Sequence, residues 1–204
     1  MKLKMCPQKI GILYKQTMKK IIYITTLIII AGCGTSKIGN NNVQNSYYPI
    51  SGMNAKFKYA NSDSYVFHKD LNKTESKNEK IYTVREIQYS WGKKTETLYR
   101  LENTNVMYFD TQSGTENMIM PSKPKVGFKW QSIDKAWEYE IVNMNADLET
   151  PTKKYSGLLV MKASQILNRD ADKLKNYLNY YEKGTGKIAS FGNGELMTYR
   201  LEQE

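Results

Sequence analysis

Cys33 is the side chain of this sequence whose position most clearly predicts chemistry. It ends the stretch Leu27–Cys33, in which an apolar run gives way to Ala31 and Gly32 directly before the thiol. Two lysines precede the run, and residues 21–30 carry no charge. A basic segment, a short apolar segment and small residues at the junction are the parts of a secretory signal. The run is too short to span a membrane, which takes about 20 apolar residues.

The segment Ile30-Ala31-Gly32-Cys33 resembles the lipobox of bacterial lipoproteins. The resemblance implies cleavage between Gly32 and Cys33, a diacylglycerol group on the Cys33 thiol and acylation of the new amino terminus. Two or three acyl chains such as palmitate hold a protein firmly at a membrane. The resemblance therefore predicts the membrane as a partner, through a lipid anchor at Cys33. The alternatives are an ordinary signal peptide and a short core segment that ends in cysteine.

The signal divides the chain into three parts. Translation is expected to start at Met18, because Met18-Lys19-Lys20-Ile21 is a typical opening of such a signal, and residues 1–32 would be removed on maturation. Residues 33–46 would form the lipidated cysteine and a flexible polar tether. Residues 47–204 are long enough for a single β-rich domain with its own core.

Charge and the residues after Cys33 bear on location and partners. Six basic residues and no acidic one precede Cys33, so their removal lowers the formal net charge of +10 by six. No Lys/Arg cluster remains, and we expect no nucleic-acid partner. Gly34 follows Cys33, and no acidic residue occurs before Asp63. By resemblance to other lipoproteins, this predicts the periplasmic face of the outer membrane.

The remaining reactive side chains predict no catalytic residue. His68 is the only histidine, and Cys33 is the only cysteine after the leader, which excludes a Cys/His metal site and a histidine-based triad. A carboxylate site stays open, although no paired-acid motif stands out, and a hydrolase is the weakest of three functional hypotheses. We therefore expect no metal, no cofactor and no enzyme activity. His68, which precedes Lys69 and Asp70, is expected at a solvated strand end.

Three short patterns have a chemical and a structural interpretation. Gly184-Thr185-Gly186-Lys187 lacks the spacing of a phosphate loop and is expected to be a hairpin turn. Glu138 and Glu140 would share the solvated face of a strand instead of forming an acid/base pair. Asp170 and Asp172 are expected to cap a short helix and not to bind a metal.

Most of the chain after Tyr47 alternates between apolar and polar residues with a period of two. This predicts strands over residues 53–60, 65–68, 81–91, 95–102, 106–109, 117–120, 137–144, 155–162, 187–191 and 195–201. The polar residues 70–80 predict a solvated loop, and Asn193-Gly194 predicts a two-residue hairpin turn. The fold class expected is all-β and mainly antiparallel.

Residues 171–182 follow a helical period. Leu174, Tyr177, Leu178 and Tyr181 have the spacing i, i+3, i+4, i+7. The pattern predicts one short helix near 170–179 that gives way to a strand near Tyr180.

Three motifs together resemble a Bacteroidota-like group of bacterial lipoproteins with a small β-rich domain. They are Tyr47-Tyr48-Pro49, Pro124-x-x-Gly127-x-x-Trp130 and Tyr180-Tyr181-x-x-Gly184-x-Gly186-x-Ile188. The resemblance implies a strongly curved sheet or half-barrel, with a strand at Tyr180-Tyr181, and no activity. From the residues themselves, Trp130 suits a core anchor with a paired N–H. Gly184 and Gly186 suit a turn or bulge that needs positive φ or a close approach of the backbone.

The sixteen tyrosines leave two interpretations open. They would fill the rim of a small sandwich, or form a concave aromatic surface for a glycan, a lipid tail or an apolar peptide. The function expected is a non-enzymatic, lipid-anchored binding or accessory module for envelope proteins. The alternative is a carrier or chaperone for a lipid or other apolar ligand in a half-barrel. A carrier needs a continuous apolar cavity, and a binding module needs an exposed patch.

Overall fold

The computed structural model describes residues 45–111, 113–168 and 171–202, all of which belong to one compact unit. Met18, Gly32 and Cys33, with the predicted signal, lie outside the described residues. Within these ranges the chain forms strands and no α-helix. The strands are β1 Asn54–Tyr59, β2 Tyr65–Lys77, β3 Lys80–Tyr89, β4 Lys94–Glu102, β5 Asn105–Asp110, β6 Thr115–Met120, β7 Lys129–Gln131, β8 Trp137–Glu149, β9 Lys154–Gln165, β10 Asn176–Glu182, β11 Gly186–Gly192 and β12 Glu195–Leu201.

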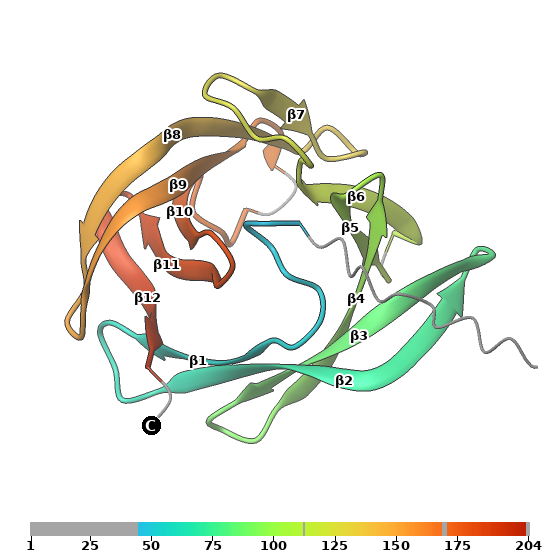
Figure 1. The fold of residues 1–204 in the computed structure, drawn as a ribbon, viewed down its shortest axis with the longest axis horizontal. Coiled ribbons are helices and arrows are strands. Elements are labelled where there is room, and N and C mark those ends of the chain that lie inside the picture. Colours follow the sequence, from blue (N-terminus) through green and yellow to red (C-terminus); the bar gives the residue numbers. More distant parts are fainter. Residues whose placement is uncertain (1–44, 112, 169–170, 203–204) are drawn as a thin grey trace, which may run out of the picture. The chain divides into compact units, whose positions relative to one another are not determined.

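All the strands belong to one antiparallel sheet that curves strongly. Its order is β6-β5-β4-β3-β2-β1-β12-β11-β10-β9-β8-β7. Two meanders, β1 to β6 and β7 to β12, are thus joined where β1 pairs with β12. Figure 1 shows the sheet bending round so that β6 and β7 approach each other. The ladder is not continued between them, so the fold is a half-barrel, as the all-β prediction allowed.

The expected loop over residues 70–80 is wrong, because β2 continues to Lys77. The hairpin of β2 and β3 reverses at Asn78 and Glu79, whose φ angles of 49° and 63° suit a tight two-residue turn. Ser76 still pairs with Ile81 near the tip. A hairpin with exposed ends needs no apolar alternation there, so its polar sequence resembles that of a loop.

The expected helix near 170–179 is also wrong. The described residues 171–175 form turns and bends, and β10 begins at Asn176. Tyr177 pairs with Ala163 on β9 and with Gly192 on β11. Neighbouring strands on both sides supply the backbone hydrogen bonds, and this tertiary pairing overrides the helical spacing. Asp172 therefore caps no helix, and Asp170 lies outside the described residues.

The terminal hairpin is confirmed. Asn193 and Gly194 connect β11 and β12, and both have positive φ, 51° and 85°. These are the backbone angles that an Asn-Gly hairpin turn needs.

The largest buried cluster lies where the two edges of the sheet meet. Trp130 on β7 donates its Nε1–H to the carbonyl oxygen of Met118 on β6 at 2.8 Å. Trp130 is therefore the buried anchor with a paired N–H that its sequence suggested. The buried members of the cluster come from strands β4 to β10 and are Tyr99, Val106, Met120, Trp130, Ile141, Leu159, Met161 and Tyr181.

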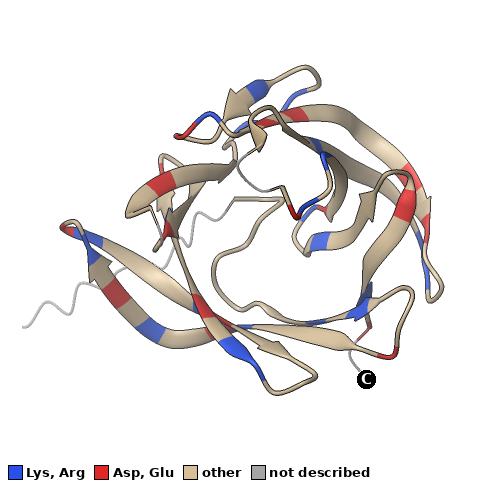
Figure 2. Cartoon of the chain, turned by 180° about the vertical axis from the view of Figure 1, so that it is seen from behind, with Lys and Arg blue, Asp and Glu red and all other residues tan. Residues whose placement is uncertain are grey.

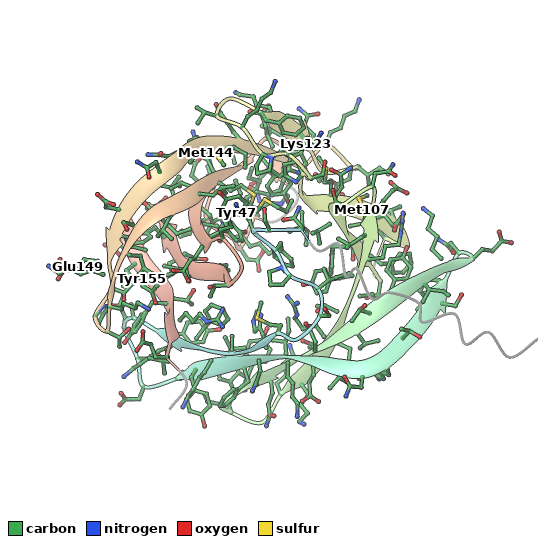
Figure 3. All side chains as sticks on the ribbon, viewed as in Figure 1. Tyr47, Met107, Lys123, Met144, Glu149 and Tyr155 are labelled. Atoms are coloured by element: carbon green, nitrogen blue, oxygen red, sulfur yellow. The ribbon has the colours of Figure 1, made fainter. Side chains whose placement is uncertain are left out.

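The segment before β1 runs inside the curve of the sheet, and Figure 3 shows Tyr47 there. Asn45 is 3% exposed, and its amide donates to the carbonyl oxygens of Thr104 at 3.1 Å and Pro121 at 2.9 Å. Its Oδ1 accepts from the backbone N–H groups of Tyr47 and Tyr48. Asn45, at the end of the expected tether, is thus part of the folded domain.

Gly186 meets this inner segment closely. Its φ is 94°, and a Cβ at this position would lie 3.2 Å from Met53 Cε and 3.3 Å from Pro49 Cδ. Gly184, with a φ of 79°, has open space around it. The predicted positive φ is confirmed at both glycines. At Gly186 the close packing of Met53 and Pro49 is a second reason why a residue without a Cβ is needed.

Candidate functional site

The inner face of the sheet contains two adjoining hollows, which we call the deep hollow and the wide hollow. The deep hollow, about 230 Å³, is lined by residues that include His68, Arg85 and Lys187. The wide hollow, about 450 Å³, is lined by strands β4 to β6 on one side and β8 to β10 on the other. Ile119 and Tyr139 line both hollows, so the two hollows are neighbours and share these side chains in their walls.

Arg85 forms a buried ion pair with Asp70 at the wall of the deep hollow. Its Nε lies 2.6 Å from Asp70 Oδ1 and its Nη2 lies 3.2 Å from Asp70 Oδ2, with side-chain exposures of 1% and 5%. Arg85 also donates to the carbonyl oxygen of Pro49 at 2.8 Å, and Asp70 accepts from the backbone N–H of Met53. The pair thus ties the inner segment to β2 and β3.

The charge of Arg85 is balanced within the fold. The guanidinium lies beside the rings of Tyr48 and Tyr99, at 5.5 and 4.9 Å from their centroids. Burial acts to lower the pKa of Arg85, but Tyr48 and the hydrogen bonds to Asp70 raise it above its usual value. Arg85 therefore stays protonated and paired, and its main role is structural.

Lys187 brings a second cation into the deep hollow. Its Nζ lies 5.7 Å from the centroid of the Phe57 ring. Among the described residues, no carboxylate forms an ion pair with it and no hydrogen bond of its ammonium group is observed. Burial alone lowers the pKa of Lys187 to about 8. The ammonium group is consequently protonated at pH 7 and has no protein anion beside it.

His68 lies on the same side of the hollow and is not at a strand end. It is central in β2, opposite Ala55 on β1 and Ile87 on β3, and its ring centroid is 5.0 Å from that of Phe57. Burial, and then the charges of Lys187 and Arg85, lower its pKa to about 3. The prediction of a strand-end residue is wrong because β2 extends beyond it, and the side chain is half-buried. His68 is neutral at physiological pH.

Tyrosine side chains supply much of the remaining inner surface. The ring of Tyr48 lies 5.6 Å from that of Tyr99 and 6.3 Å from that of Tyr181. Burial raises the pKa of Tyr48 and of Tyr181 well above the usual value, so both phenols stay neutral. The tyrosines that line the two hollows are Tyr48, Tyr99, Tyr108, Tyr139, Tyr177 and Tyr181. They form the concave aromatic surface that was one of the two interpretations of the sequence.

The other candidate residues do not assemble into a site. Glu138 and Glu140 lie 3.4 and 3.3 Å from the ammonium of Lys129, on a partly exposed face of the sheet. Gly184 to Lys187 is the hairpin turn between β10 and β11 and the start of β11. Within residues 45–202, apart from the undescribed positions, no three His, Cys, Asp or Glu side chains come close enough to hold a metal ion.

Sequence reasoning did not single out Arg85, Asp70 or the inward position of Lys187. The residues come from β3, β2 and β11, and only the strand order brings them together. One local signal was present for Lys187: it is the single charge in β11, Gly186–Gly192, a strand that is otherwise mostly buried. A lone lysine within such a strand indicates either a paired charge or a binding site.

Positive and negative residues are mixed along the described part of the chain (Figure 2). Figure 2 shows Lys and Arg interspersed with Asp and Glu over the strands and turns. Among the described residues, no helix has the length and apolar character required to cross a membrane.

No protein-family model, no curated protein and no solved structure matches this chain. The class of protein is accordingly set by its geometry: an antiparallel half-barrel with an aromatic concave face. Among the described residues, Lys187 on this face has no protein counter-ion.

Proposed function

We propose that this chain is a lipid-anchored cell-envelope protein that binds an apolar ligand on the inner face of its half-barrel and performs no chemistry on it. The observation that supports this function is the pair of adjoining hollows. Ligand sites in proteins are concave, of about 300–1,000 Å³, and mostly lined by apolar and aromatic side chains with a few polar groups. The wide hollow alone, about 450 Å³, falls in this range.

The walls of the wide hollow suit an apolar ligand. Tyr108, Trp137 and Tyr177 present aromatic surface, and Met118 and Ile119 present flexible or branched aliphatic surface. Aromatic rings contribute large contact area at a small cost in conformational entropy. A carrier was expected to need a continuous apolar cavity, and two neighbouring hollows that share Ile119 and Tyr139 in their walls favour this alternative over a module with a flat docking patch.

Ligand binding is tested on the full-length mature protein with the neutral fluorescent probe N-phenyl-1-naphthylamine. We expect saturable binding to the wild type. Ile119→Trp, which fills the junction of the hollows, should weaken binding at least about fivefold. Ile81→Trp is the matched control, because Ile81 is exposed on the outer end of β3. Equal binding by all three proteins, or no binding to the wild type, would contradict the proposal.

The anchor is tested separately with a palmitate analogue in growing cells. The wild type should be labelled and recovered with outer membranes, and Cys33→Ala should lose the label and the membrane association. The basis of this expectation is the signal that ends in Ala31-Gly32-Cys33. Equal labelling of the variant would contradict lipidation of Cys33 without affecting the ligand proposal.

A second candidate is the accessory module for an envelope protein. Ile133, Ile166 and Leu167 are large exposed side chains on adjoining turns, since the N–H groups of Ile166 and Leu167 both bond to the carbonyl oxygen of Ala136. Clustered exposed apolar residues are typical of protein contacts. Crosslinking in cells should then capture a defined envelope protein with the wild type and lose it with Ile133→Ser and Leu167→Ser combined.

A further inference from the structure

We propose that the deep hollow selects ligands that carry an anionic head group, held by the ammonium of Lys187, with their apolar part in the wide hollow. This inference rests on the proposed function of the inner face as an apolar ligand site. It adds the chemical class of the ligand: an amphipathic anion such as a fatty acid.

The charges around the deep hollow leave one positive charge uncompensated. Arg85 is neutralised by Asp70, and His68 is neutral. Tyr48, Tyr139 and Tyr181 also line the space, and phenols carry no charge near pH 7. Lys187 is therefore the only lining group among the described residues whose charge has no partner.

Polar donors near Lys187 can complete an anion site. Asn179 lines the same hollow, and its Oδ1 accepts a hydrogen bond from Ser190 Oγ at 2.7 Å. With the oxygen occupied in this way, the amide NH₂ of Asn179 is the group left to donate. A carboxylate accepts several hydrogen bonds through its two oxygens. An ammonium and an amide on neighbouring strands are a suitable pair of donors for such a group.

The energetics favour an incoming anion. Lys187 is half-buried, and a charge that is partly removed from water without a partner is destabilising. An anion that enters the hollow supplies the missing partner where the dielectric constant is lower than in bulk water. The same environment gives an uncharged ligand no such gain. Met53, Phe57 and Met161 line the same hollow and give it apolar surface beside the polar groups.

The shape of the space suits one head group and one tail. The deep hollow, about 230 Å³, is the smaller, and the wide hollow adjoins it at Ile119 and Tyr139. A ligand with its head group at Lys187 can therefore extend its chain past these two residues into the aromatic part of the site.

The test compares decanoate with decanol, which has the same chain length and no charge, by isothermal titration on the mature protein. We expect decanoate to bind at least about tenfold more tightly at pH 7. Lys187→Met should remove this preference, and Lys187→Arg should retain part of it. Lys183→Met is the matched control, because Lys183 is exposed in the turn directly before β11.

Two further measurements locate the anion. The C2–H resonance of His68, the only histidine of the chain, should shift on addition of decanoate at pH 7 and shift less with decanol. Affinity for decanoate should fall about tenfold from pH 7 to pH 9, because the pKa of Lys187 is about 8 in the free protein and only the protonated form binds the anion. Arg85 and His68, the other basic groups that line the deep hollow, keep their charge states over this range.

The outcomes separate the inference from the function on which it rests. Equal affinity for decanoate and decanol, unchanged in Lys187→Met, overturns the inference and leaves the apolar site intact. Binding of neither compound overturns both. A preference for decanoate that survives in Lys187→Met also overturns the inference, because another cation then holds the head group.

Discussion

The indole Nε1 of Trp130 donates to the carbonyl oxygen of Met118 at 2.8 Å and so joins the two edge strands, β7 and β6. A second bond runs from the backbone N–H of Ile133 to Asn117 Oδ1 at 2.7 Å. Open sheet edges invite pairing with other chains. Here side-chain bonds close the half-barrel where no backbone ladder does, and they also hold together the two walls of the wide hollow.

Trp130→Phe tests this closure. The variant keeps an aromatic ring but leaves the Met118 carbonyl without its donor, so we expect a loss of about 1–2 kcal/mol in the free energy of unfolding. Urea denaturation measures it. Trp91→Phe is the control, since Trp91 is 58% exposed, and it should change stability by less than about 0.5 kcal/mol. An equal effect of both substitutions would contradict a special role for the Trp130 bond.

Gly186→Ala should destabilise the fold more than Gly184→Ala. Both glycines have positive φ, which costs a residue with a Cβ about 1 kcal/mol. At Gly186 the added methyl also meets Met53 and Pro49, so the expected loss is about 2–4 kcal/mol. Thermal and urea unfolding of the two variants compare the effects. Similar losses of stability at both positions would show that Met53 and Pro49 can move away from the added methyl group at little cost in free energy.

Asp70→Asn should be among the most destabilising single substitutions. It leaves the buried guanidinium of Arg85 without its counter-ion, and breaking such a pair from one side costs about 3–5 kcal/mol. Asp63→Asn is the matched control, because Asp63 is fully exposed and pairs with Lys58 only at 3.4 Å. A loss for Asp70→Asn no greater than that of the control would mean that Arg85 reaches water in the folded protein.

The strands were predictable from the sequence wherever one face is buried, as in β3, β4 and the final hairpin. The outer half of β2 was not, because exposed strands carry no apolar alternation. The strand at Tyr177 was hidden by helical spacing, and only pairing with β9 and β11 decides its conformation. The candidate site was harder to predict from the sequence than the strands. Lys187, His68 and Arg85 are far apart in sequence, and the meeting of β11, β2 and β3 around one hollow is a property of the strand order.

Lys187→Met should raise the stability of the ligand-free protein. The pKa of Lys187 is about 8 in the folded state and near 10.5 when unfolded, so the unfolded state holds the proton more tightly. Below pH 8 the wild type therefore carries a penalty of about 1–3 kcal/mol that the variant lacks. From pH 8 to 10.5 the penalty should disappear as pH rises. Urea unfolding at pH 7 and pH 10 measures the change, with Lys183→Met as the control; a gain that does not depend on pH would contradict burial of the charge.

His68 should make the fold sensitive to acid in a defined range. Its pKa falls from about 6.5 in the unfolded chain to about 3 in the fold, so between these values only the unfolded state binds the proton. Stability should then decrease as pH drops below 6.5. The pKa of Glu116 is lowered to about 2, chiefly by its hydrogen bond to Arg100. Protonation of Glu116 therefore reduces the stability of the fold only below about pH 4.5.

Comparison of the wild type with His68→Gln from pH 7 to pH 4.5 therefore isolates the histidine. The wild type should lose about 1–2 kcal/mol more than the variant over this range. Lys187→Met in the wild-type background should reduce the loss, because the charge of Lys187 is one cause of the low pKa of His68. Parallel pH profiles for all three proteins would show that the fold does not lower the pKa of His68 and would contradict its place beside Lys187 in the deep hollow. A steeper profile in the wild type, reduced by Lys187→Met, would instead show that both residues share the space assigned to the anionic head group.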